Sequence, residues 1–127
     1  MNWYKKHLYA SAKKKVLAVD LDGTIAEDAK FPKIGSPKSG VQKALKKLQE
    51  SGYKIHIYTC RLNGKNHEDG EKLYFRTMAQ ITDYLEENKI PYDSIIEWSE
   101  GKPFADAYID DKAIHFKSWQ GILNELV

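Results

Sequence analysis

A short apolar segment that ends in two carboxylates constrains the fold of this chain most strongly. Val16–Val19 is uncharged and rich in valine, which predicts a buried strand, and Asp20-Leu21-Asp22-Gly23-Thr24 follows at once. Side chains two residues apart on a strand point the same way, so we expect Asp20 and Asp22 to share one small volume. Two such carboxylates repel each other unless a cation or a shared proton relieves them. The segment therefore predicts a site for a hard cation beside a nucleophilic carboxylate.

Strand and helix patterns alternate along the rest of the chain, which predicts a mostly parallel sheet with helices on both faces. The predicted strands are Lys15–Asp20, Lys54–Thr59, Ser94–Trp98, Ala107–Asp110 and a short last one at Ala113–Phe116. The predicted helices run from Ser36 or Ser39 to Gly52, through Tyr74–Leu85, and onward from Ser118. We expect Ser39 and Gln42 to form a capping box, and Trp119 to lie in the core. In open α/β sheets, ligands bind beyond the carboxyl ends of the strands, where Asp20 and Asp22 fall.

Length and composition predict a single domain over residues 15–127, preceded by a basic leader at residues 1–14. The net charge of +2 is too small to require a nucleic-acid partner. No uninterrupted apolar stretch follows the charges of the leader, so it does not resemble a secretion signal, and no segment is long enough to cross a bilayer. Cys60 is the single cysteine, which excludes an internal disulfide and fits a reducing compartment. We therefore expect a soluble cytoplasmic protein without membrane partners.

Further polar residues fall near the ends of the predicted strands or in loops. Thr59 ends the second strand, Lys102 stands in Gly101-Lys102-Pro103, and Asp110-Asp111 ends Ala-Tyr-Ile. Together with Asp20 and Asp22 they suit phosphoryl transfer through a covalent aspartyl intermediate. A carboxylate attacks phosphorus, Mg²⁺ held by oxygen ligands neutralises charge, and a hydroxyl and an ammonium hold the phosphate oxygens. A second carboxyl protonates the leaving oxygen and later activates water.

The order of these residues resembles that of the haloacid dehalogenase (HAD) superfamily, most of whose members are phosphatases. The resemblance covers about residues 15–117 and includes all four sequence motifs of the superfamily. The first motif, D-x-D-G-T after an apolar strand, is matched by Asp20–Thr24 without departure. Thr59, Lys102 and Asp110-Asp111 stand at the second, third and fourth motifs. The resemblance implies a three-layer α/β/α Rossmann-like fold with a mostly parallel sheet.

The resemblance also implies a role for each of these positions. Asp20 would be the nucleophile and a metal ligand, and Asp22 would be the general acid/base, with its backbone carbonyl on the metal. Thr59 would bind a phosphate oxygen, and Lys102 would stabilise Asp20 and the transferring phosphoryl group. Asp110 would ligate Mg²⁺ directly, and Asp111 would ligate or support it. The residues beside the first two motifs complete the predicted substrate-binding set: Gly23, Thr24, Cys60 and Arg61.

The superfamily usually carries a cap domain after the first or second motif, and neither gap of this chain is long enough to hold one. Capless members leave the site open, act on large substrates, or cover the site with a neighbouring subunit. The expected function is therefore that of an Mg²⁺-dependent phosphatase acting on a phosphomonoester, either a small molecule or a polymer end. The sequence allows a homo-oligomer and does not determine the number of subunits.

Several residues also have plainer interpretations. Cys60 suits a small packing residue better than a cysteine nucleophile, because no phosphate-cradling loop surrounds it. Arg61 is as readily a solvated arginine as a substrate contact. His67-Glu68-Asp69 is better read as part of a charged loop than as a second metal cluster, because neighbouring residues do not easily converge on one ion.

Two other classes of function stay open on the sequence. A phospho-accepting signalling module also uses an acidic pair, a phosphorylated Asp, a Thr and a Lys. Receiver domains, however, place their D-D pair early and the phosphorylated Asp on a later strand, which is the reverse of the order here. A nucleic-acid-binding accessory protein with little turnover is suggested by the basic leader, which carries Trp3, Tyr4 and Tyr9.

Overall fold

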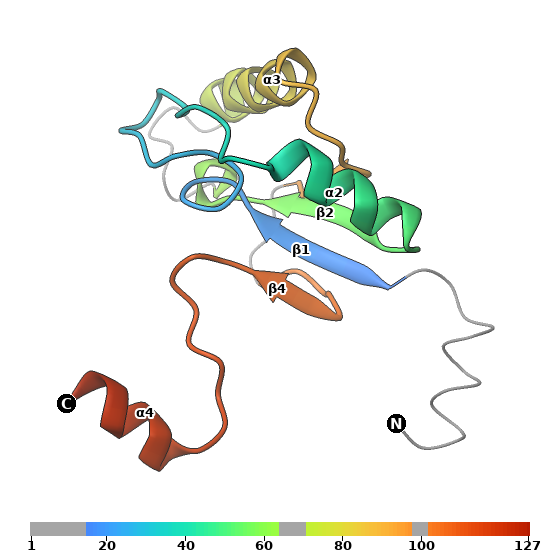
Figure 1. The fold of residues 1–127 in the computed structure, drawn as a ribbon. Coiled ribbons are helices and arrows are strands. Elements are labelled where there is room, and N and C mark those ends of the chain that lie inside the picture. Colours follow the sequence, from blue (N-terminus) through green and yellow to red (C-terminus); the bar gives the residue numbers. More distant parts are fainter. Residues whose placement is uncertain (1–14, 64–70, 98–101) are drawn as a thin grey trace.

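The computed structural model describes residues 15–63, 71–97 and 102–127, so the basic leader and His67-Glu68-Asp69 lie outside the described residues. Its centre is a four-stranded, all-parallel sheet in the order β3-β2-β1-β4 (Figure 1). The strands are β1 (Val16–Asp20), β2 (Lys54–Tyr58), β3 (Ser94–Ile95) and β4 (Ala107–Ile109). The predicted Rossmann-like α/β fold is therefore confirmed.

Two helices cover one face of this sheet. They are α2 (Val41–Glu50), between β1 and β2, and α3 (Glu71–Glu87), between β2 and β3. Val19 of β1 and Ile57 of β2 pair in register, and they form one buried cluster with Leu45 of α2 and Ile81 of α3. Burial of such side chains stabilises a domain by roughly 1.5–3 kcal/mol each. The core therefore fixes β1 at the middle of the sheet, with its carboxyl end open to the loops.

The helix α2 begins later than the sequence predicts, and the predicted capping box is wrong. Its N-cap is Gly40, which has a φ of 80° and makes no side-chain cap hydrogen bond. Glycine adopts this left-handed conformation without the steric cost that Ser39 would meet there. A tight turn is thus preferred over a serine cap at this point.

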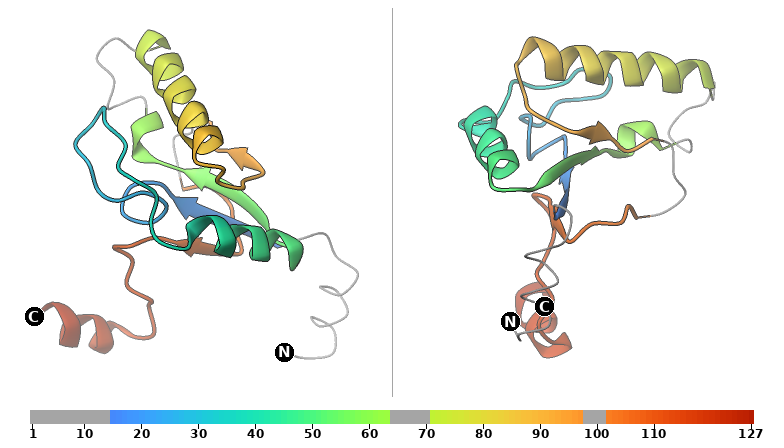
Figure 2. Two further views of the ribbon diagram at one scale, coloured as in Figure 1. Left: turned by 45° about the horizontal axis from the view of Figure 1, so that its top comes forward. Right: turned by 90° about the vertical axis from the view of Figure 1, so that its right-hand side faces the viewer.

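The helix α4 (Trp119–Leu126) begins where the sequence predicts, but it does not join the core. Ser118 Oγ accepts a hydrogen bond of 3.0 Å from the Gly121 amide, as an N-cap serine should. The helix lies away from the sheet (Figures 1 and 2), and Trp119 is 73% exposed. The predictions of a strand at Ala113–Phe116 and of a buried Trp119 are therefore wrong. The segment after β4 runs outward from the edge of the sheet, so α4 is not brought back onto it.

The loop between β1 and α2 folds closely onto the end of β1. The Gly23 amide donates to the Ala26 carbonyl at 2.8 Å, and the Ala26 amide donates to the Leu21 carbonyl at 2.9 Å. Ala26 also forms an isolated bridge to Pro37, which closes the loop at its base. Residues 23–40 thus form a compact loop without a cap domain. None of the described helices is long and apolar enough to cross a membrane.

Candidate active site

Three carboxylates meet at the carboxyl edge of the sheet. Asp20 is the last residue of β1, and Asp110 and Asp111 follow β4, which pairs with β1 in parallel. Parallel neighbours end at the same edge, so residues more than 80 positions apart in sequence come together. One carboxylate oxygen from each of the three lies within 4.8 Å of the others. The sequence predicts these three carboxylates at one edge together with Asp22, and the structure brings together the three without Asp22.

A glycine allows the Asp111 side chain to approach β1. Gly23 has a φ of +82°, and a Cβ atom placed on it would overlap the Asp111 carboxylate. A residue with a side chain would be strained there by the backbone conformation, and its Cβ would displace the end of the Asp111 side chain. The glycine of the D-x-D-G-T segment therefore leaves room for Asp111 in the acidic cluster.

Burial and the neighbouring carboxylates raise the pKa of Asp20 from 3.8 to about 6. The largest cause is burial, followed by the charge of Asp110, and the charges of Asp111 and Asp22 add to it. A hydrogen bond from the Leu21 amide acts in the opposite direction. A cation among these oxygens would favour the ionised form of Asp20. Three hard carboxylate oxygens, two of them from partly buried residues, fit Mg²⁺.

Asp110 has the opposite electrostatic environment. Its Oδ1 accepts a hydrogen bond of 2.7 Å from the Lys112 amide, and its Oδ2 accepts one of 2.9 Å from the Tyr58 hydroxyl. These two bonds lower the pKa of Asp110. Burial and the hydrogen bond to Asp110 raise the pKa of Tyr58. Asp110 is thus a fixed carboxylate, while Asp20 is the group of this pair that readily gains a proton.

Tyr58 is not among the site residues predicted from the sequence, although its position carries a signal. Tyr58 is the last residue of β2 and pairs in register with Asp20. A polar aromatic residue at the end of the strand next to the nucleophile could have been recognised from that position alone.

Asp22 does not join the other three carboxylates directly. Its Oδ2 lies 2.7 Å from Arg61 Nε and its Oδ1 lies 2.8 Å from Arg61 Nη2, in a bidentate ion pair. β1 ends at Asp20, so the alternation of a strand does not extend to Asp22, and the expected shared volume is replaced by this pairing. Asp22 remains near enough for its charge to raise the pKa of Asp20.

Arg61 is buried rather than solvated, since only 4% of it is exposed. Besides Asp22, its guanidinium donates from Nη1 to the Pro32 carbonyl at 3.0 Å and from Nη2 to the Lys33 carbonyl at 2.7 Å. These four hydrogen bonds direct its donors toward the protein, so the solvated alternative of the sequence analysis is wrong. Arg61 therefore links the loop between β1 and α2 to Asp22.

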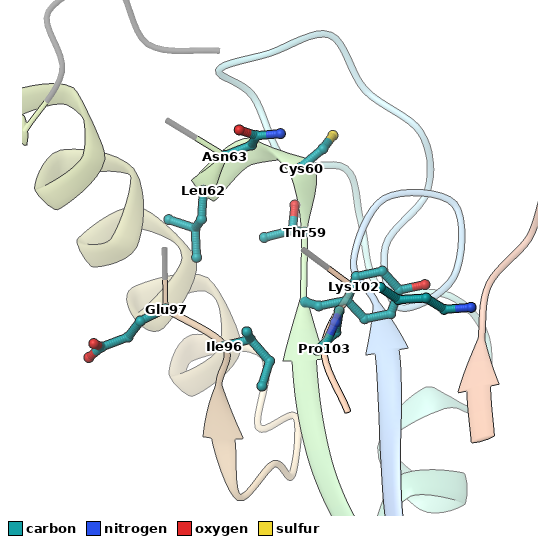
Figure 3. Close-up of a pocket in the computed structure, with 9 residues that line it drawn as sticks. Thr59, Cys60, Leu62, Asn63, Ile96, Glu97, Lys102 and Pro103 are labelled. Atoms are coloured by element: carbon teal, nitrogen blue, oxygen red, sulfur yellow. The ribbon is translucent and has the colours of Figure 1, made fainter. Parts of the chain in front are cut away.

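A pocket of about 250 Å³ lies beside the carboxyl end of β2 (Figure 3). Thr59, Cys60 and Lys102 are among its lining residues, so the structure brings the second and third motif positions together. Thr59 is 8% exposed, and its Oγ1 accepts a hydrogen bond of 3.2 Å from the Arg61 amide, which caps the short 3-10 helix η1 (Cys60–Leu62). The Lys102 ammonium lies 4.1 Å from the centroid of the Tyr108 ring.

A second hollow, of about 340 Å³, shares Cys60 with this pocket. It is lined by Asp22, Ala29, Phe31, Cys60 and Arg61. Cys60 is exposed and borders both hollows, so it is not the packing residue that its type suggested. Thr24, by contrast, has a buried Oγ1 without a hydrogen-bond partner in the described part of the chain.

Comparisons with known proteins support the fold. No protein-family model matches the chain, and no curated protein matches it. A conserved protein from Bacteroides thetaiotaomicron has a similar structure, with 24% identity and a TM-score of 0.59 over 90% of this chain and 89% of that one. A crystallised target protein from Vibrio cholerae has 28% identity and a TM-score of 0.56 over 87% of this chain and 94% of that one. The chain therefore shares its α/β fold along nearly its whole length with bacterial proteins of similar extent.

Proposed function

We propose that this protein is an Mg²⁺-dependent phosphatase that hydrolyses a phosphomonoester through an aspartyl-phosphate on Asp20. The observation that carries the proposal is the cluster of Asp20, Asp110 and Asp111 at the carboxyl edge of the sheet. The motif order of the haloacid dehalogenase superfamily supports the same assignment. The single cysteine supports a reducing compartment, so we place the reaction in the cytoplasm.

Asp20, Asp110 and Asp111 are the residues that would hold Mg²⁺. When bound, this ion offsets the negative charge of the carboxylates and of the phosphate dianion. Both oxygens of Asp110 accept hydrogen bonds, which keep that residue ionised and oriented, whereas Asp20 accepts one, from the Leu21 amide. Asp20 is therefore the better nucleophile of the two.

The chemical step has a place for each of the remaining residues. An oxygen of Asp20 forms a bond to phosphorus while the ester P–O bond breaks, and Asp22 gives a proton to the leaving oxygen. Asp22 then takes a proton from water, which attacks the aspartyl-phosphate and releases inorganic phosphate. Thr59 and Lys102 line one pocket, and Asp20, Asp110 and Asp111 are not among its lining residues. The Thr59 hydroxyl would hold a phosphate oxygen there, and the Lys102 ammonium would have to leave the Tyr108 ring, whose centroid lies 4.1 Å from it, to hold another.

The test is release of inorganic phosphate from p-nitrophenyl phosphate and from a panel of phosphorylated metabolites, with Mg²⁺ and with EDTA. We expect release that requires Mg²⁺ and that Asp20→Asn lowers by at least about 10³-fold. Asp83→Asn is the matched control, because Asp83 is exposed on α3. Equal activity of wild type and Asp20→Asn would falsify the assigned nucleophile.

Two results without phosphate release would indicate the other two functions, a phospho-accepting signalling module and a nucleic-acid-binding accessory protein. A phosphoprotein that forms on Asp20 and persists without phosphate release would indicate a phospho-accepting module. Salt-dependent binding of DNA or RNA without phosphate release would indicate the accessory protein.

A further inference from the structure

We propose that Arg61 is a positioning residue for the reaction, and that it fixes the carboxyl group of Asp22 and the adjoining loop in one arrangement. The inference rests on the proposed function, since it takes Asp22 as the general acid/base. It assigns Arg61 to Asp22, whereas the sequence left a substrate contact and a solvated arginine as the two alternatives.

The first support is the geometry of the ion pair. Arg61 Nε and Nη2 meet the two oxygens of Asp22 at 2.7 and 2.8 Å, which is the parallel arrangement of two hydrogen bonds that only arginine provides. Each oxygen of a carboxylate can accept a second bond, so the pair leaves room for a proton or a water molecule on Asp22. The ion pair therefore fixes the plane of the Asp22 carboxyl group, and Asp22 can still exchange a proton with the leaving group or with water.

The second support is that the guanidinium is itself held from the other side. The guanidinium also donates to the carbonyls of Pro32 and Lys33, in the loop between β1 and α2. The Pro32 carbonyl also accepts a hydrogen bond of 2.7 Å from Gln80 Nε2 of α3. Arg61 is thus anchored to a loop that is in turn anchored to a helix, so it cannot follow Asp22 if Asp22 moves.

The third support is the place where Asp22 is held. Asp22 and Arg61 both line the hollow that also contains Phe31, whose side chain is 45% exposed and whose ring centroid lies 5.5 Å from the guanidinium carbon. A leaving group that enters this hollow would meet the carboxyl of Asp22 and the loop at the same time. General acid catalysis depends on such placement within hydrogen-bond reach.

The experiment compares two leaving groups. p-Nitrophenolate leaves without a proton, whereas an alkoxide needs one, so a general acid accelerates alkyl phosphates much more than p-nitrophenyl phosphate. Arg61→Lys keeps the charge but loses the two-pronged contact. We expect it to lower kcat for an alkyl phosphate by about 10²-fold and for p-nitrophenyl phosphate by less than about 5-fold. Arg76→Lys, at an exposed site on α3, is the matched control and should change neither rate.

Asp22→Asn should reproduce this dependence on the leaving group, and Arg61→Lys should add little in the Asp22→Asn background, because the two residues act as a unit. An equal loss of kcat with both substrates, or none, would overturn the positioning role. Failure of the proposed function is a different result: the wild type then releases no phosphate, or its activity does not depend on Asp20.

A measurement on the wild-type protein guards against an Arg61→Lys variant that does not fold. The Arg61 Nε–H signal in nitrogen-15 NMR spectra should be protected from exchange with water in the wild type and lose protection in Asp22→Asn. A freely exchanging Nε–H in the wild type would contradict the proposal whatever the variants do.

Discussion

Removal of the Asp20 charge should stabilise the metal-free protein, although it abolishes the proposed chemistry. The pKa of Asp20 is raised from 3.8 to about 6 by burial and by the charges of Asp110, Asp111 and Asp22. A shift of about 2 units corresponds to roughly 3 kcal/mol if none of it is screened by solvent. Asp20 is about half-buried, so we reduce this to about 1–2 kcal/mol.

The sign follows from proton linkage. Between the unfolded pKa of 3.8 and the folded pKa of about 6, the folded state binds more protons than the unfolded one. The free energy of unfolding therefore falls as pH rises through this window, and above about pH 6 the full cost of the ionised Asp20 is present. Asp20→Asn removes that cost.

The assay is urea denaturation in EDTA at pH 5 and at pH 7.5, with Asp83→Asn as the control. We expect Asp20→Asn to raise the free energy of unfolding by about 1–2 kcal/mol at pH 7.5 and by less at pH 5. In saturating Mg²⁺ the order should reverse, because a ligand bound by the folded wild type stabilises it and the variant has lost one ligand. An unchanged or lower free energy of unfolding in EDTA at pH 7.5 would refute the electrostatic reasoning.

Three other variants test separate parts of the structure. Gly23→Ala should lower the free energy of unfolding by about 1–3 kcal/mol and weaken Mg²⁺ binding, because the φ of Gly23 is +82° and a Cβ would overlap Asp111. Urea denaturation and calorimetric titration measure the two effects, and wild-type values in both would contradict the assigned contact. Tyr58→Phe removes the hydrogen bond to Asp110, so it should lower the free energy of unfolding by about 1 kcal/mol in urea denaturation and weaken Mg²⁺ binding several-fold in calorimetric titration. Unchanged Mg²⁺ affinity would show that this bond does not orient Asp110. Deletion of residues 118–127 should change the free energy of unfolding by less than about 1 kcal/mol, because α4 contains no buried residue; a larger loss would place α4 against the sheet in solution.

The acidic cluster was predictable from the sequence because two local patterns and one rule of topology determine it. Asp20 and Asp110-Asp111 each follow a strand that can be recognised from its apolar residues, and parallel strands end at a common edge. The N-cap of α4 at Ser118 was predictable for a similar reason, since a serine cap depends only on the next few residues.

The pairing of Asp22 with Arg61 could not be predicted in the same way. The two residues are 39 positions apart, and their contact depends on the path of the loop that presents the Pro32 and Lys33 carbonyls. The position of α4 could not be predicted from the sequence either, because its apolar face is equally consistent with packing on the sheet and with the exposed position observed. In both cases the deciding contacts are long-range, whereas the patterns in the sequence are local.

The most direct test of the central claim is a crystal structure of the protein with Mg²⁺ and beryllium fluoride, which mimics a phosphoryl group on a carboxylate. We expect the beryllium fluoride on the Asp20 carboxylate and Mg²⁺ beside it, in contact with Asp110. Beryllium fluoride on a different residue, or Mg²⁺ bound away from these carboxylates, would contradict the account.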